Sequence, residues 1–416
     1  MITISTFIIW ILYFISLYFI IFWLLVFIDG GINEEKKRKL DIYPMVTIVI
    51  PAYNEGKRNL RKTIESALSL NYPKDKIEII AVNHGSSDNT GEIINSYTEI
   101  KPLHIGRTPK ERKGKAVNEA LKLAKGEFFI CMDADSTIEK DALIKMLPYF
   151  SDDNIASVLP LMKIVDPKGI LEKIQWCEYL VNFFYKKLMS KLDCIHVTPG
   201  PFSIYRTEVL RKIGMFDENN LTEDLEISLR LQKYNYKIIQ VLDSEVYTIA
   251  PETFKEFYKQ RNRWYKGAVL NALNYKNMMF NRKYGDFGFI QMPRILIAGL
   301  TAVIMFMITI YNYVIEPAAR NIYNLSLIDF NVYPSIKNTV INFRLIDFNY
   351  TNTFYFIVIF IIILIVLKLS YVYTKEKMIR HGYVTIPSYL ILYSLLASIA
   401  WMGVLIDLII KRKQNW

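Results

Sequence analysis

Residues 45–55 read MVTIVIPAYNE, an apolar run that ends in a polar segment. The run is short and rich in β-branched residues, which predicts a buried strand at 45–51. Further strands are predicted at 76–82 and 127–132, with helices at 60–70, 90–97 and 113–124 between them. This alternation predicts an α/β domain with a mainly parallel, Rossmann-like sheet.

Polar residues follow each predicted strand, namely Ala52-Tyr53-Asn54-Glu55, residues 83–88 and Asp133-Ala134-Asp135. In parallel sheets ligands bind beyond the carboxyl ends of the strands, so these segments are where chemistry is expected. Two carboxylates that close a buried strand need cations or water. Mg²⁺ or Mn²⁺ that bridges a nucleotide diphosphate is one suitable partner, and a solvated turn that caps a helix is the structural alternative.

The charge-free run 5–27 is long enough to cross a bilayer and lacks a signal-peptide cleavage site, which predicts a retained anchor. The basic cluster at 36–39 predicts a cytoplasmic flank and an N-terminus outside. Further spans are predicted at 295–315, 354–373 and 388–410, joined by a loop at 316–352. Four crossings place the C-terminus outside, against the preference of the basic residues 411–413 for the inside.

These patterns divide the 416 residues into an anchor at 1–30, a catalytic domain at 40–285 and a membrane region with about three spans at 286–416. The net charge of +11 comes largely from basic residues beside the spans or among acids, which fits anionic lipids and phosphorylated substrates and argues against nucleic acid. The three cysteines have no disulfide or metal spacing and are expected to be reduced.

Six ordered motifs lie between residues 44 and 285: IPAYNE at 50–55, GSSDNT at 85–90, KGKAVNEAL at 113–121, DAD at 133–135, TED at 222–224 and QRNRW at 260–264. With these motifs the chain resembles the membrane-integrated, processive branch of glycosyltransferase family 2, which includes poly-N-acetylglucosamine, hyaluronan, chitin and cellulose synthases. The stretches 199–206 and 251–264 look most like the poly-N-acetylglucosamine group. The resemblance implies a GT-A catalytic domain beside an α-helical transmembrane region.

The resemblance also implies a role for each matching position. Asp224 would be the catalytic base with Glu223 beside it, and the nucleotide sugar would contact Ala52, Tyr53, Glu55, His84, Lys115, Asp133 and Asp135, with Mg²⁺ or Mn²⁺ on Asp135. Gln260, Arg261, Arg263 and Trp264 would meet the acceptor at the mouth of a sugar channel. The structural alternatives are a capped helix at 225–235, a solvated basic turn for Lys115 and an interfacial helix at 260–264.

One departure concerns the nucleotide. Relatives carry two aspartates before the Gly-Ser turn, one of which reads uracil, whereas this chain has Asn83-His84. A neutral acceptor makes a weaker hydrogen bond than a carboxylate, so uridine is expected with less discrimination.

The expected function is inverting transfer from a UDP-sugar, such as UDP-N-acetylglucosamine or UDP-glucose, to a β-linked polysaccharide at the cytoplasmic membrane face, coupled to its translocation. Alternatives are a single addition to a membrane lipid, or a catalytically silent export subunit, which the retained carboxylates oppose. The expected partners are the donor, a growing glycan or lipid acceptor, and the bilayer. Four spans are few for a wide channel, so a second copy or an accessory subunit is also expected.

Overall fold

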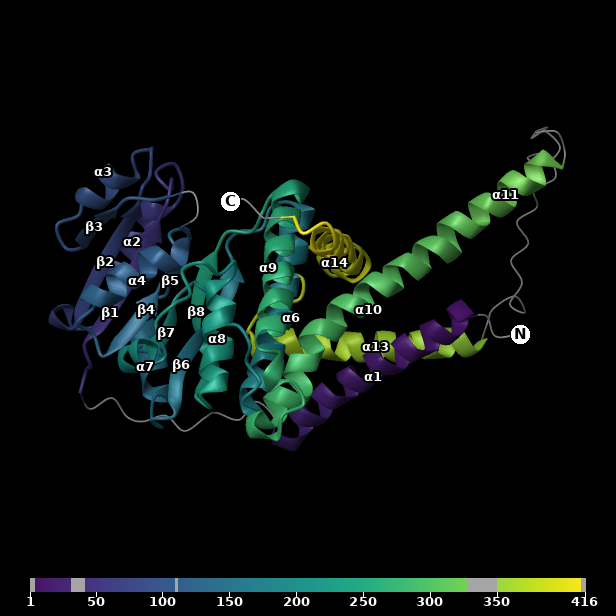
Figure 1. Cartoon of the computed structure of the whole chain (residues 1–416), viewed down its shortest axis with the longest axis horizontal. Coiled ribbons are helices and arrows are strands. Elements are labelled where there is room, and N and C mark those ends of the chain that lie inside the picture. Colours follow the sequence, from purple (N-terminus) through teal and green to yellow (C-terminus); the bar gives the residue numbers. More distant parts are fainter. Residues whose placement is uncertain (1–3, 31–41, 109–110, 328–349, 413–416) are drawn as a thin grey trace.

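The computed structural model describes residues 4–30, 42–108, 111–327 and 350–412. An α/β domain lies at one end of the molecule, and long helices extend from it on the other side (Figure 1). The basic cluster at 36–39 lies outside the described residues.

The described strands form one eight-stranded sheet in the order β3-β2-β1-β4-β7-β6-β8-β5. Their bounds are β1 Val46–Ala52, β2 Ile77–His84, β3 Lys101–Ile105, β4 Phe128–Cys131, β5 Thr137–Ile138, β6 Ile155–Ile164, β7 Ser203–Arg206 and β8 Lys237–Thr248. The half β3-β2-β1-β4 is parallel, as predicted. The other half is mixed, because β7 runs antiparallel to β4 and β6 while β6 and β8 are parallel.

The α/β domain buries both faces of this sheet. Its helices are α2 Leu60–Leu68, α3 Thr90–Asn95, α4 Lys113–Leu123, α5 Ala142–Met146, α6 Ile170–Lys191, α7 Thr207–Lys212, α8 Glu223–Lys233 and α9 Phe254–Asn274. Along β1, Ile48 and Ile50 enter one core with Leu60, whereas Val49 enters the opposite core with Val117. Successive side chains of a strand point to opposite faces, so a continuous apolar run is what a doubly covered strand requires.

Within the described residues, four helical stretches are long and apolar enough to cross a membrane: Phe7–Gly30, Phe287–Ser326, Thr353–Tyr373 and Thr385–Ile409. The helices are α1 Ile4–Gly30, α10 Met292–Ile310, α11 Glu316–Ser326, α13 Tyr350–Tyr373 and α14 Thr385–Ile409. Short helical turns occupy Lys74–Lys76, Leu147–Tyr149, Lys276–Met278, Arg282–Tyr284, Phe287–Gln291 and Tyr311–Ile315. The predicted anchor and three later spans are therefore present as helices.

The expected loop at 316–352 is helical at its beginning. A π-helical turn at Tyr311–Ile315 continues α10 into α11, where Pro317 occupies a first-turn position that tolerates proline. An ion pair of 2.7 Å between Arg320 and Glu316, one turn apart, also favours the helix. Residues 328–349, which hold most of the repeated LIDFN sequence, lie outside the described residues.

Helix α9 is attached to the last long helix, α14. The rings of Tyr265 and Trp401 stack with centroids 4.4 Å apart and planes within 5° of parallel. Lys266 lies 3.6 Å from Asp407, and a Cβ at Gly403 would lie only 2.0 Å from the Tyr258 hydroxyl. The three contacts lie along one side of α9, so the helix that carries the QRNRW motif and α14 form one packed unit.

Candidate active site

The polar segments after β1 and β2 are joined by hydrogen bonds. The Asn54 backbone N–H donates to Ser86 Oγ at 3.0 Å, and the Glu55 backbone N–H donates to Thr90 Oγ1 at 2.9 Å. Asn54 has a φ of 54°, in the left-handed region that asparagine tolerates better than most residues. The IPAYNE and GSSDNT motifs therefore form one wall at the carboxyl edge of the parallel strands.

An aromatic and a guanidinium group stack on this wall. Arg107 follows β3, and its guanidinium carbon lies 3.6 Å from the centroid of the Tyr53 ring, which is 45% exposed. Ala52, at the end of β1, is buried beneath this pair. An exposed planar surface of this kind suits the stacking of a nucleotide base.

His84 is the last residue of β2 and is only 4% exposed. Burial, followed by the charge of Arg107, lowers its pKa, so the imidazole is neutral near pH 7. Its Nε2 atom has no hydrogen-bond partner within the part of the chain that the structure describes. The neighbouring Asn83 instead accepts the Ser86 backbone N–H at 3.1 Å. Of this pair, His84 is the one left available to a ligand.

The DAD motif lies beside a lysine that opens α4. Lys113 Nζ pairs with Asp133 and lies 3.6 Å from a carboxylate oxygen of Glu223. Gly200 packs against this pair: a Cβ there would lie 2.6 Å from both Lys113 Nζ and Asp133 Oδ1. The TPGPF segment before β7 therefore touches the same carboxylates, and the close approach requires glycine.

Asp135 and Glu55 are neighbouring carboxyl groups with raised pKa values. Burial is the main cause for Asp135, followed by the charge of Asp133. Burial also raises the pKa of Glu55 to about 7, with further contributions from Asp135 and Asp133. Carboxylates gathered at one edge without enough cations favour a bound cation or protonation.

A divalent cation fits this chemistry. No three His, Cys, Asp or Glu side chains of the described residues come together as a complete protein cage. Mg²⁺ and related hard cations are commonly held by one or two carboxylates together with substrate phosphates. Asp135, with its raised pKa, is suited to be that protein ligand.

Glu223 and Asp224 lie in the first turn of α8, two residues earlier than the predicted helix. Burial and the charge of Glu223 raise the pKa of Asp224 to about 6, while Lys113 and Arg263 act in the opposite direction. The Asp224 backbone carbonyl accepts from Thr198 Oγ1 at 2.9 Å, which ties α8 to the TPGPF segment. A half-buried carboxyl group with this pKa can serve as a base near neutral pH.

Lys115 points to other groups. It pairs with Glu119 at 2.7 Å and lies 3.7 Å from Glu218, whereas Lys113 meets Asp133. The structure thus brings Lys113 to the carboxylates expected to meet the diphosphate and directs Lys115 to the surface of α4.

The QRNRW motif is divided between two environments. Trp264 and Arg263 are half-buried, and the charge of Arg263 acts on Asp224. Arg261 is fully buried, pairs with Glu178 of α6 at 2.5 Å, and lies 4.3 Å from the Trp264 ring centroid. Gln260 accepts a hydrogen bond of 2.8 Å from Arg261. Arg261, expected at the acceptor, therefore supports the motif from behind.

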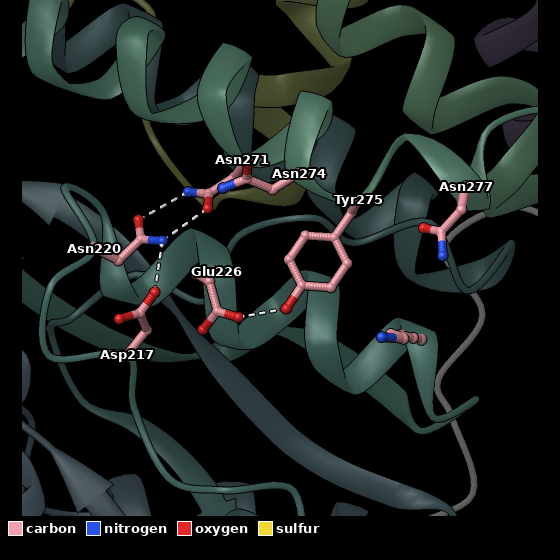
Figure 2. Close-up of a pocket in the computed structure, with 8 residues that line it drawn as sticks. Asp217, Asn220, Glu226, Asn271, Asn274, Tyr275 and Asn277 are labelled. Atoms are coloured by element: carbon pink, nitrogen blue, oxygen red, sulfur yellow. Dashed lines mark hydrogen bonds between the residues drawn. The ribbon is translucent and has the colours of Figure 1, made fainter.

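A separate polar pocket of about 320 Å³ lies between α8 and α9 (Figure 2). It is lined by Asp217, Asn220, Glu226, Lys233, Asn271, Asn274, Tyr275 and Asn277, none of which the sequence singled out. Asn271 and Asn220 bond to one another at 3.0 Å, and Tyr275 donates to Glu226 at 2.5 Å. These groups largely satisfy one another, which indicates a structural role in joining α8 to α9.

Three residues that sequence reasoning missed touch the site: Arg107, Lys113 and Gly200. Gly106-Arg107 directly follows a strand, and Gly200 stands between two prolines, so each had a local signal. The choice between Lys113 and Lys115 had none, because both open the same helix.

Comparison with known proteins agrees with this geometry. Residues 47–214 match the family described as Glycosyl transferase family 2. A poly-beta-1,6-N-acetyl-D-glucosamine synthase of Staphylococcus epidermidis is 32% identical over 225 residues, which are 53% of this chain and 54% of that protein. The protein of the same name from Staphylococcus aureus strain COL is 29% identical over 262 residues, 61% of this chain and 63% of that protein. The chain thus matches between half and two thirds of the length of these relatives.

Among solved structures, the mannosyltransferase PcManGT from Pyrobaculum calidifontis, in complex with GDP-Man and Mn²⁺, superposes with a TM-score of 0.58 at 16% identity. The match covers 78% of this chain and 90% of that one, and it shows a shared GT-A-like fold. The chain therefore contains a glycosyl transferase family 2 domain, built on a GT-A-like mixed sheet and joined to helices long and apolar enough to cross a membrane.

Proposed function

We propose that the chain is an inverting glycosyltransferase that moves a sugar from a nucleotide donor to a growing β-linked glycan at the cytoplasmic membrane face. The observation that carries the proposal is the meeting of Asp133, Lys113, Glu223 and Asp224 at one edge of the sheet, beside the Tyr53–Arg107 stack. A base surface, charges for a diphosphate and a basic carboxylate are the parts that sugar transfer from a nucleotide requires.

The donor is proposed to be a UDP-sugar such as UDP-N-acetylglucosamine or UDP-glucose. Tyr53 and Arg107 stack on the base, and the neutral His84 accepts the imide N–H of uracil through Nε2. Lys113 interacts with the diphosphate and with Asp133, which holds the ribose side. A divalent cation on Asp135 would offset the negative charge that develops on the leaving diphosphate.

The acceptor hydroxyl is proposed to lose its proton to Asp224 as its oxygen bonds to the anomeric carbon and the bond to the diphosphate breaks. Lys113 holds Glu223 ionised beside the base, and that negative charge strengthens Asp224 as a proton acceptor. Inversion follows, because the acceptor attacks from the side opposite the leaving group.

Polymerisation is proposed from the place of Trp264. This half-buried ring lies on α9, which packs against α14, so an aromatic platform stands between the carboxylates and the membrane helices. The name of the synthases that the chain resembles supports the same reading. Passage of the product through the helices, with a second copy or accessory subunit, belongs to this proposal.

The deciding experiment incubates the purified full-length chain with a panel of labelled sugar nucleotides and then sizes the product. We expect a polymer from one UDP-sugar, no product from Asp224→Asn, and normal product from Glu208→Gln, which removes an exposed carboxylate on α7. A single-sugar glycolipid as the only product would replace the synthase reading with transfer to a lipid. Transfer by Asp224→Asn within about tenfold of the unmodified chain would remove Asp224 as the base.

A further inference from the structure

Two basic side chains near the membrane helices have no acidic partner among the described residues. Lys186 of α6 lies with its Nζ 4.6 Å from the centroid of the Phe183 ring. Arg294, near the start of α10, contacts Met189 Sδ at 3.7 Å and lies 5.8 Å from the Trp23 ring centroid. Both are half-buried, and burial lowers the pKa of Lys186 to about 8. Cations that lose water without gaining a counter-charge are costly, so these two require an explanation.

The two cations surround one buried histidine. His196 precedes the TPGPF segment, and its Nδ1 atom lies 2.8 Å from Gln291 Nε2. Burial, and then the charges of Arg294 and Lys186, hold the pKa of His196 well below its usual range, so it adds no third charge. Because both cations act on the same imidazole, they belong to one cluster formed where α6 and α10 meet.

Two buried polar atoms of this cluster lack partners in the described part of the chain. Trp23 Nε1 has no acceptor, although the residue is only 3% exposed, and Gln291 Oε1 has no donor in a fully buried side chain. An unsatisfied buried polar atom costs about 1–3 kcal/mol. The cluster therefore offers two cations and one N–H donor to an anion, and one acceptor to a hydroxyl.

The cluster lies where the long helices leave the α/β domain. Helix α1 contacts both α6 and α10, and Figure 1 shows the C-terminal end of α1 and the beginning of α10 beside α6. Tryptophan and arginine at the end of a span are typical of the headgroup level of a bilayer. The place suits a ligand that comes from the membrane.

We propose that Lys186, Arg294 and Trp23 form a binding site for the head group of an anionic phospholipid. The phosphate lies between the two cations and accepts from Trp23 Nε1, and a head-group hydroxyl donates to Gln291 Oε1. The bound lipid supplies the missing counter-charge and joins α1, α6 and α10. The inference goes beyond the proposed function, because the site lies away from the strand ends and binds its lipid without any sugar nucleotide.

The test is native mass spectrometry of the full-length chain in a neutral detergent, with added phosphatidylglycerol or with diacylglycerol of the same acyl chains. We expect phosphatidylglycerol to bind at least about tenfold more tightly than diacylglycerol, and Lys186→Gln/Arg294→Gln to lose about tenfold or more of that affinity. The matched control, Lys168→Gln/Arg282→Gln, removes two exposed charges and should bind as the unmodified chain does.

The ligand source is tested with glycerol 3-phosphate, the soluble head group. If it displaces phosphatidylglycerol at equal concentration, the site takes a free phosphate and the lipid assignment is wrong. Equal phosphatidylglycerol affinity in the unmodified chain and the double variant overturns the site itself. Should the double variant fail to fold, Lys186→Arg and Lys186→Gln give the same answer, since only the second loses the charge and should lose affinity.

Discussion

Replacing Gly200 by alanine is expected to abolish most activity while leaving the fold intact. The added Cβ would lie 2.6 Å from Lys113 Nζ and 2.6 Å from Asp133 Oδ1, and 2.7 Å from the other carboxylate oxygen. Non-bonded heavy atoms need about 3.5 Å, so the ion pair must retreat by roughly 1 Å. The atoms that move are the ends of side chains, so the free energy of unfolding should change by less than about 1 kcal/mol.

Catalysis tolerates this displacement far less than folding does. A misplacement of about 1 Å at a reacting centre costs about 100-fold in rate, or about 2.7 kcal/mol. We therefore expect kcat/KM for sugar transfer to fall about 100-fold, with part of the loss in KM for the donor, because Lys113 is proposed to contact the diphosphate. The assay is steady-state UDP release with a parallel thermal melt.

The matched control is Gly106→Ala, whose Cβ would meet nothing within 4 Å. It should keep its activity within about twofold. If Gly200→Ala folds and retains activity within about threefold of the unmodified chain, the Lys113–Asp133 pair is not held in place for catalysis, and the reasoning fails.

The remaining predictions concern three side chains. Asp224 accepts a proton only when ionised, and burial with the charge of Glu223 raises its pKa to about 6, so kcat/KM should rise with pH up to about 6 and then level; a flat profile over that range would exclude it as the base. Trp264→Ala should shorten the product while slow UDP release persists, as product sizing with matched UDP assays can show; an unchanged length distribution would contradict a platform role. His84→Asp should tighten UDP binding about fivefold in calorimetry, because a carboxylate accepts the imide N–H more strongly and the nearby Arg107 offsets its charge; weaker binding would show that the base is read elsewhere.

The parallel half of the sheet could be predicted from sequence because each strand is a short apolar run bounded by polar residues. β1, β2 and β4 lie within two residues of the predicted ends, and the carboxylates after β4 lie at the strand edge as expected. Hydropathy likewise located the long helices, since length and composition alone decide whether a helix can cross a bilayer.

Contacts between distant segments could not be predicted in this way. Lys113 and Lys115 are two positions apart on one helix, so their side chains point about 200° apart, and only the fold decides which meets Asp133. The antiparallel placement of β7 and the burial of Arg261 against Glu178 depend on partners over 70 residues away in the chain. Such pairings leave no periodic signal in a single sequence.

The attachment of α9 to α14 affects how this molecule can be divided. Hydropathy suggests a cut near residue 285, yet a soluble fragment ending there would expose the side of α9 that holds Tyr265 against Trp401 and Lys266 against Asp407. Such a fragment should aggregate, and a chimaera that exchanges only the membrane helices should lose the same contacts. The natural unit of exchange between relatives is therefore α9 together with all that follows it.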